Sequence, residues 1–202
     1  MAQPYVITLS RDFASMGRTI AQLLSQHLGC AFYDRDIVEQ TARRMGLPVS
    51  IISDTEEAAH NLFYKRIYPL GTGVKSMQDE IFQVQKNIIR DLAAKESCIV
   101  VGRCADQILK DLPRVLNVHI FAPADQRLIN CVEKLEMDPE EARRTIARVD
   151  RARALYHRLY GGGDVFTNCH VMLNSSQFGV EGTARVLEHI VRDTFSLPRS
   201  NR

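Results

Sequence analysis

The chain has 202 residues, of which 45% are hydrophobic and 25% are charged, as is typical of one compact globular domain. Its 26 basic and 24 acidic residues leave a formal net charge of +2, which argues against a general attraction to nucleic acid or anionic membranes. The longest apolar stretches, residues 5–9 and 98–101, are far shorter than the roughly 20 residues that cross a bilayer. The amino terminus lacks a secretory signal. We therefore expect a single cytoplasmic domain, residues 1–202, without membrane or nucleic-acid partners.

The basic residues are unevenly divided, with 20 arginines against 6 lysines. The planar guanidinium of arginine can bind a phosphate or a carboxylate through two parallel hydrogen bonds, whereas lysine offers a point charge. Six arginines lie between residues 143 and 158, a stretch in which Asp150 is the one acidic residue. This stretch is a local basic site that the overall charge does not reveal.

The first predicted elements are a strand and three helices. Residues 5–9 are β-branched and aromatic and precede a polar segment, which predicts a buried strand. Apolar residues then recur with helical spacing over residues 20–28, and a glycine follows where such a helix would end. Further helices are predicted over residues 36–45 and 49–59. The stretch 61–75, with its aromatic residues, proline and glycines, fits no single element.

The middle of the chain predicts two more strands. Apolar residues have helical spacing over residues 78–95, and the continuous apolar run 98–101 that follows is typical of a fully buried strand. Residues 115–121 predict another strand. Apolar residues at helical spacing over 128–135 predict the helix after it.

The last third of the chain begins with a well-marked helix start. Residues 138–141 read Asp-Pro-Glu-Glu, which combines a capping residue, a proline in the first turn and a capping box. This start opens the arginine-rich helix, which the glycines at 161–163 end. A last strand over residues 171–173 and a closing helix with its apolar stripe over 180–191 complete the pattern.

Strands alternate with helices along most of the chain. This order predicts an α/β fold in which helices cover both faces of a mostly parallel sheet. In such sheets, ligands bind beyond the carboxyl ends of the strands. Functional residues are therefore expected in the segments that directly follow the strands.

The first of these segments, residues 10–19, joins a strand to a helix. A joint of this kind can present backbone N–H groups and the positive helix end to a phosphate. The segment lacks the lysine and the leading glycines of a Walker A loop, G-x-x-x-x-G-K-[ST]. On its own it therefore favours an ordinary turn in which Arg18 is a solvated surface residue.

The loop and several later segments together resemble the motifs of the cytidylate kinase-like family, in the family's order. The matching stretches are Leu9-Ser10-Arg11-Asp12-Phe13-Ala14-Ser15-Met16-Gly17-Arg18, Phe32-Tyr33-Asp34, Val101-Gly102-Arg103-Cys104-Ala105-Asp106, Asp150-Arg151-Ala152-Arg153-Ala154 and Val171-Met172-Leu173-Asn174-Ser175-Ser176. The resemblance implies a three-layer P-loop kinase-like fold in one domain. Its implied parts are a core of about residues 5–30, 97–136 and 169–195, a helical acceptor-binding segment of about 34–96 and a lid of about 138–165.

The resemblance also implies an activity. The chain is expected to move the γ-phosphoryl group of ATP, with Mg²⁺, to a small phosphorylated acceptor, CMP or a related nucleoside monophosphate. Its partners would be this nucleoside triphosphate and this acceptor, and no sequence feature indicates an oligomeric state. Catalysis would come from positioning and electrostatics, with no covalent intermediate and no obligatory strong base.

Carried over position by position, the resemblance implies three sets of site residues. Nucleotide-binding residues would be Arg11, Ala14, Ser15, Met16, Gly17, Arg18 and Thr19. Arg18 would replace the missing lysine at the β- and γ-phosphates, and the Thr19 hydroxyl would bind or orient Mg²⁺. Catalytic charge would come from Arg18 and from the lid residues Arg148, Arg151 and Arg153. Acceptor-binding residues would be Asp34, Arg35, Arg103 and Asp150.

The residues by themselves leave alternatives open. Asp34 could cap the helix that follows it, and Arg103 could pair with Asp106 at the surface instead of facing the site. The arginine-rich helix could be an ordinary solvated face. In a third interpretation it binds RNA or DNA, although no recognition motif accompanies it.

Two departures from the family's loop pattern bear on activity. Ala14 stands at the family's first loop glycine, and Met16 stands at the first of its paired glycines. If either position requires a positive φ, a side chain there costs on the order of 1 kcal/mol, and Met16 would crowd a bound phosphate. With the missing lysine, these departures favour the rival function, a nucleotide-binding regulatory protein that has lost phosphoryl transfer.

Other reactive side chains are expected to be structural. The histidines show no metal-ligand spacing. Cys104 has no base placed near it by the sequence, so we expect it to be a packing residue. Tyr156 and Tyr160 are expected to pack under the lid.

Overall fold

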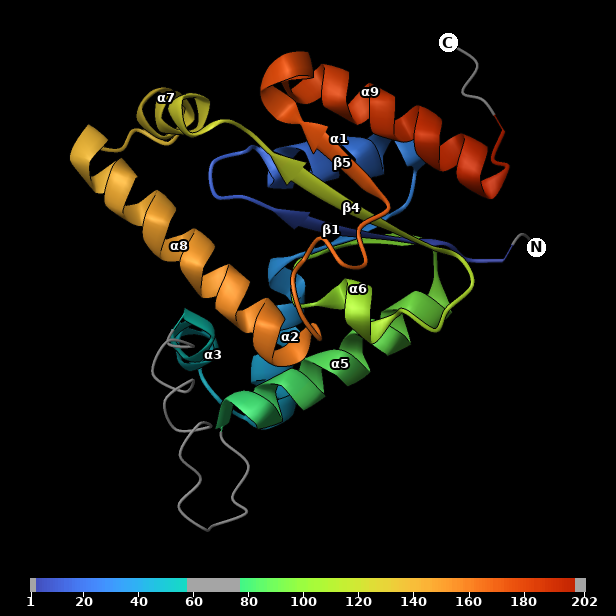
Figure 1. Ribbon diagram of the computed structural model, residues 1–202. Helices are drawn as coiled ribbons and strands as arrows, with labels where there is room; N and C mark the ends of the chain where they lie inside the picture. The colour runs from blue at the N-terminus through green and yellow to red at the C-terminus, as the bar shows by residue number, and fades with distance from the viewer. Residues whose placement is uncertain (1–2, 58–76, 199–202) are drawn as a thin grey trace.

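The structure, a computed structural model, describes residues 3–57 and 77–198. Its centre is a five-stranded sheet with the strand order β2-β3-β1-β4-β5, and all four neighbouring pairs are parallel (Figure 1). This architecture confirms the predicted α/β fold. The strands are β1 (Val6–Arg11), β2 (Ala31–Tyr33), β3 (Cys98–Val101), β4 (Val115–Phe121) and β5 (Val171–Asn174).

Helices cover both faces of the sheet, as predicted (Figure 1). One face carries α1 and α9, and the other carries α2, α5 and α6. The predicted stretch 61–75 and residues 58–59 of a predicted helix lie outside the described residues. The helices are α1 (Gly17–Leu28), α2 (Arg35–Met45), α3 (Val49–Glu57), α5 (Met77–Lys95), α6 (Ala105–Ile108), α7 (Ala124–Lys134), α8 (Pro139–Tyr160) and α9 (Ser175–Phe195).

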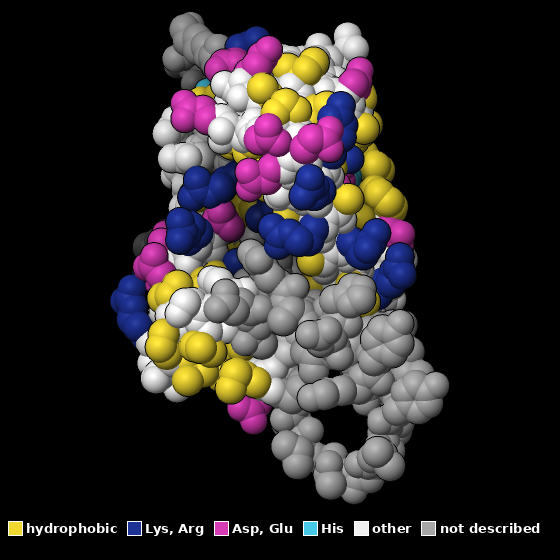
Figure 2. Space-filling view, turned by 90° about the vertical axis from the view of Figure 1, so that its left-hand side faces the viewer, with side chains coloured by type: hydrophobic (Ala, Val, Ile, Leu, Met, Phe, Trp, Pro, Cys, Tyr) yellow, Lys and Arg dark blue, Asp and Glu magenta, His cyan; other side chains and the backbone are white. Residues whose placement is uncertain are grey.

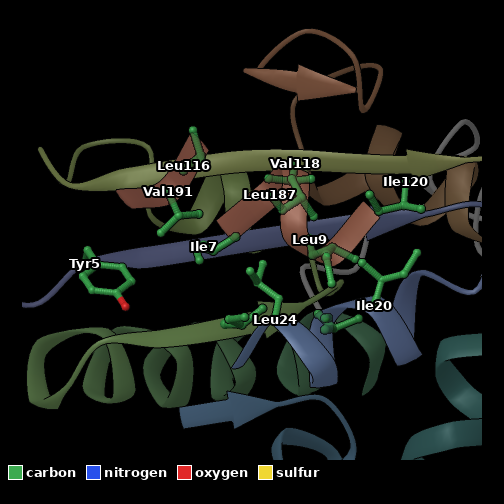
Figure 3. Close-up of a cluster of buried hydrophobic side chains, with 14 of the residues drawn as sticks. Tyr5, Ile7, Leu9, Ile20, Leu24, Leu116, Val118, Ile120, Leu187 and Val191 are labelled. Atoms are coloured by element: carbon green, nitrogen blue, oxygen red, sulfur yellow. The ribbon is translucent and has the colours of Figure 1, made fainter. Parts of the chain in front are cut away.

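The core has two main halves because side chains alternate between the two faces of each strand. Ile7 and Leu9 of β1 pack toward α1 and α9, where they meet Leu24 and Leu187 (Figure 3). Val6 belongs to the cluster on the opposite face, together with residues of α2 and α5. Both clusters contain side chains that are fully buried. The sheet is therefore a rigid base for the loops at its carboxyl edge.

Helix α8 begins and ends where the sequence predicts. The Asp138 carboxylate accepts hydrogen bonds from the N–H groups of Glu140 and Glu141, at 2.9 and 3.1 Å. At its other end, Tyr160 stacks on Phe82 of α5 with the ring centroids 4.3 Å apart, and Tyr156 meets Phe82 edge-on. These contacts attach the carboxyl end of α8 to α5. They agree with the expectation that both tyrosines are packing residues.

Some boundaries differ from the prediction. Strand β1 continues two residues past Leu9, because Ser10 and Arg11 still pair with His119 and Ile120 of β4. Strand β2 and helix α6 were not predicted, since elements of three and four residues are too short to show a period. Within residues 3–57 and 77–198, no helix has the length and apolar character that would let it cross a membrane.

Candidate functional site

A cavity of about 460 Å³ lies at the carboxyl edge of the sheet, between the ends of β1 and β3 and the inner side of α8. Figure 2 views the molecule from the side on which α8 lies and shows Lys and Arg side chains in a band across the middle of that face. The charged residues that line the cavity are Arg11, Arg103, Arg148, Arg153, Arg158, Asp12, Asp106, Asp150 and Asp164. The structure thus brings together five of the predicted site residues: Arg11, Arg103, Arg148, Arg153 and Asp150.

The loop between β1 and α1 has the backbone geometry of a glycine-containing turn. Ala14 has a φ of 58° and Met16 a φ of 60°, so both positions are left-handed, and each side chain carries the strain expected for a non-glycine residue. The Met16 side chain packs against the core cluster between α1 and α9. This contact directs the side chain toward the core.

Side chains of neighbouring elements hold the loop in place. The Ser15 hydroxyl donates to the carbonyl oxygens of Asp12 and Ile120, both at 3.0 Å. The Asn130 amide donates to the Ala14 carbonyl at 2.8 Å, and the Ser175 hydroxyl donates to the Ser15 carbonyl at 2.7 Å. Three elements, β4, α7 and the start of α9, therefore fix the loop.

Helix α1 begins at Gly17 without a side-chain cap. The first intrahelical bond is the one from the Ile20 N–H to the Met16 carbonyl, at 3.0 Å. The N–H groups of Gly17, Arg18 and Thr19 precede this bond and form the positive end of the helix. A phosphate is the kind of group that such an end binds.

Two glycines make room for Arg11. A Cβ atom at Gly17 would lie 2.7 Å from the Arg11 Cβ, and a Cβ atom at Gly102 would lie 2.5 Å from the Arg11 Nη1. Gly102 also has a φ of 75°. The guanidinium of Arg11 therefore passes close to the β3–α6 turn, on the lining of the cavity.

Arg18 and Asp34 form a pair outside the cavity lining. The Arg18 Nε donates to the Asp34 Oδ2 at 2.6 Å, and the Arg11 Nη2 lies 3.9 Å from the Asp34 Oδ1. Asp34 is only 5% exposed and stands at the N-cap of α2, but its side chain makes no capping hydrogen bond. Asp34 therefore pairs with arginine and does not cap α2, and its role in acceptor binding stays a prediction. Thr19 and Arg35 are exposed and lie outside the cavity lining.

Three of the four predicted site residues on helix α8 line the cavity, namely Arg148, Asp150 and Arg153, and the fourth, Arg151, does not. Arg153 donates to the Arg11 carbonyl at 3.0 Å, and its Cζ lies 6.0 Å from the Phe13 ring centroid. Burial lowers the pKa of Arg153, and the Asp150 carboxylate opposes that shift. Arg148 and Arg151 are both exposed, and of the two only Arg148 lines the cavity. Arg151 and Arg153 are two residues apart, which places them about 200° apart around a helix.

Arg103 faces the cavity, and Asp106 has a different partner. Asp106 accepts from the His157 Nε2 at 3.0 Å, so the surface pair between Arg103 and Asp106 that the sequence allowed is not the one seen. Cys104 is buried, and burial raises the pKa of its thiol. This agrees with a packing role for Cys104.

Sequence reasoning missed three residues near the site. Arg127 of α7 pairs with Asp150 and also donates to the Phe13 carbonyl at 3.4 Å. His119 bonds the Ser10 hydroxyl through Nδ1 at 2.9 Å, and its Nε2 lies 3.5 Å from an Asp12 oxygen. His157 lines the same cavity. Arg127 follows a predicted strand by six residues, so the search beyond strand ends could have found it. Nothing in the local sequence indicates that His119 and His157 line the same cavity.

The residues present fit a magnesium nucleotide. Arginine guanidiniums and an uncapped helix start suit phosphate oxygens. Mg²⁺ takes oxygen ligands and commonly keeps several waters beside one or two protein groups. Among the oxygen groups here are the Asp12 carboxylate in the loop and the Thr19 hydroxyl, which is exposed in the first turn of α1.

Comparison with known proteins agrees with this geometry. The model of the cytidylate kinase-like family matches residues 6–177. The chain belongs to the cytidylate kinase-like family. This membership confirms the resemblance found in the sequence motifs. No curated protein matches the chain significantly.

Solved structures share the fold of this family member. An uncharacterized protein from Eubacterium ventriosum has a TM-score of 0.70 and 20% identity, over 93% of this chain and 98% of that chain. A shikimate kinase from Bacteroides thetaiotaomicron has a TM-score of 0.57 and 11% identity, over 93% of this chain and 98% of the kinase. At these identities the similarity shows the fold alone, a P-loop kinase-like α/β fold.

Proposed function

We propose that the chain is a phosphotransferase that moves the γ-phosphoryl group of ATP to a small phosphorylated acceptor. By its family, CMP or a related nucleoside monophosphate is the proposed acceptor. The observation that carries the proposal is the convergence of Arg11, Arg103, Arg148 and Arg153 on one cavity, which Asp12 also lines at the beginning of the loop that leads to the uncapped start of α1. Bound phosphates are the ligands that such a set of guanidiniums recognises.

In phosphoryl transfer the protein contributes mainly by positioning the two substrates and by stabilising negative charge. Negative charge spreads over the equatorial oxygens of the phosphoryl group as it passes between donor and acceptor. Arg153, half-buried and hydrogen-bonded to the Arg11 carbonyl, can stabilise that charge from a position that is already held in place. Arg148 adds charge from α8, and Arg103 adds charge from the β3–α6 turn. Mg²⁺, held through Thr19, would neutralise charge on the donor phosphates.

The remaining roles are proposals at single positions. The backbone of Ala14, Ser15, Met16 and Gly17 is proposed to cradle the phosphates, with Arg11 beside it. Arg18 is proposed to bridge the β- and γ-phosphates, which requires its guanidinium to leave Asp34. An unaltered turnover number in Arg18→Ala would remove Arg18 from the mechanism. Asp34, Arg35, Arg103 and Asp150 are proposed to bind the acceptor, and Arg151 to reach the phosphates from the exposed side of α8.

The decisive experiment supplies MgATP together with a panel of acceptors. The panel contains the nucleoside monophosphates and small alcohol and sugar acceptors, and ADP formation is measured alongside the phosphorylated product. The proposal predicts a product with at least one phosphorylated acceptor. Product with an alcohol alone would change the acceptor class, and no product with any acceptor would contradict the proposal.

The rival function, nucleotide binding without transfer, is favoured by the loop itself. Ala14 and Met16 both stand at left-handed positions, and the Walker A lysine is missing. Calorimetry separates the two functions. If MgATP binds while the acceptor panel gives no product, the chain is a nucleotide-binding regulatory protein.

A further inference from the structure

Asp150, on α8, makes a contact with the loop between β1 and α1. Its Oδ1 accepts a hydrogen bond from the Phe13 N–H at 2.8 Å. Its Oδ2 accepts from the Nη1 of Arg127, on α7. One carboxylate therefore occupies a backbone donor of the proposed phosphate loop and a guanidinium at the same time.

This arrangement of donors suits a phosphate as well as it suits a carboxylate. A backbone N–H and a guanidinium are the groups that bind phosphate oxygens in proteins. Asp150 presents two oxygens to them, whereas a terminal phosphate presents three. The carboxylate and a nucleotide phosphate would therefore compete for one position.

The guanidinium of Arg127 has a donor, its Nε–H, that Asp150 does not satisfy. Its side chain is only 14% exposed. Its Nε is buried and has no hydrogen-bond partner among residues 3–57 and 77–198. A buried donor without an acceptor costs free energy. An anion with more oxygens at this position would relieve that cost.

We propose that Asp150 and Arg127 form an exchangeable contact: a nucleotide phosphate replaces the Asp150 carboxylate at the Phe13 N–H and takes Arg127 as its cation. The inference rests on the proposed function and extends it. It makes Arg127 a phosphate-binding residue, and it makes Asp150 a competitor of the donor nucleotide before the acceptor arrives. The Asp150 contact holds part of the population in a form that must open before the phosphate binds, so it weakens the apparent affinity.

The first test measures MgATP binding by calorimetry in the absence of any acceptor, so that a role of Asp150 in acceptor binding does not enter. Asp150→Asn removes the charge that competes with phosphate and should tighten binding about tenfold. Asp164→Asn is the matched control, because Asp164 lines the same cavity and its carboxylate accepts a hydrogen bond from the Phe166 N–H. The control should change the affinity by less than about twofold. Asp150→Ala repeats the test if the asparagine variant does not fold.

The second test addresses Arg127. Arg127→Met should weaken MgATP binding about tenfold. Arg127→Lys should restore part of the loss, because the lysine ammonium keeps the positive charge but lacks the two parallel donors of the guanidinium. Arg144→Met, at an exposed position of α8, is the control. Hydrogen exchange of the Phe13 amide without ligand should be faster in Asp150→Asn than in the wild type, whatever the protein binds.

The outcomes separate this inference from the proposed function. If the wild type binds MgATP and forms product, but Asp150→Asn binds no tighter than Asp164→Asn, the exchange is wrong and the proposed function stands. If Arg127→Met binds MgATP as the wild type does, Arg127 is not a phosphate ligand. If no variant binds MgATP, both the inference and the proposed function fail.

Discussion

Arg11 owes its position to two residues that have no side chain. Gly17 and Gly102 both lie where a Cβ atom would collide with Arg11, at its Cβ and at its Nη1 respectively. At Gly102 the colliding atom is the far end of a flexible side chain. A methyl group there is therefore expected to move the guanidinium and leave the fold intact.

Gly102→Ala separates the backbone effect from the effect on Arg11. Gly29 has a similar positive φ, 63° against 75°, and open space around it. Each alanine should lower the free energy of unfolding by about 1 kcal/mol because of the left-handed backbone. Triphosphate binding should weaken in Gly102→Ala alone. Denaturant unfolding and calorimetry check this, and equal binding in the two variants would contradict a role for Arg11.

Arg153 is held at the end of β1 by its hydrogen bond to the Arg11 carbonyl. Arg153→Ala should lower kcat by roughly 100- to 1,000-fold, as the loss of one preorganised donor commonly does. KM for the donor should change less than kcat, because the interaction strengthens as charge develops. Arg144→Ala removes the same charge from an exposed position of the same helix. Equal losses in both variants would mean that general charge, and not the position of Arg153, matters.

Helix α8 is anchored at its carboxyl end by an ion pair that depends on pH. His157 contacts Asp106 through Nε2 and the Gly163 carbonyl through Nδ1, both at 3.0 Å. Burial opposes the charged imidazole, but the bonds to Asp106 and Gly163 and the charges of Asp106 and Asp164 outweigh it and raise the pKa of His157.

The raised pKa of His157 predicts a direction for stability. Its contribution is fully present below the ordinary histidine pKa of about 6.5 and is lost as pH rises through the higher folded value. The free energy of unfolding of the wild type should therefore exceed that of His157→Asn by more at about pH 6 than at about pH 9. Urea unfolding at several pH values measures the difference. A difference that stays constant or grows with pH would contradict the assignment.

Long elements with clear ends were predictable from the sequence. The start of α8 follows from Asp138 and Pro139, whose capping chemistry is local, and the strands β3 and β4 follow from continuous apolar runs. Strand β2 was missed because three half-buried residues carry no period. Its existence depends on pairing with β3, a contact between residues far apart in the chain.

The candidate site was predictable in part because a parallel sheet gathers strand ends at one edge. This rule places Arg11 and Arg103 at one edge of the sheet, where Arg148 and Arg153 of α8 line the same cavity. It does not say which side of a long helix faces inward, so Arg151 was grouped with Arg148 although it points elsewhere. The rule also does not predict which side chains bond to each other. The bonds from Arg18 to Asp34 and from Arg127 to Asp150 depend on how the helices pack.

The molecule as a whole presents a cavity lined by arginines of β1, the β3–α6 turn and α8, at the beginning of a loop with no lysine. We propose that this loop still holds a triphosphate. A crystal structure with a non-hydrolysable ATP analogue and Mg²⁺ tests this. We expect the triphosphate along residues 12–19, with the Arg153 guanidinium in hydrogen-bond contact with a phosphate oxygen. A triphosphate that binds away from this loop, with Arg153 still on the Arg11 carbonyl and no phosphate beside it, would show that the loop does not bind phosphate.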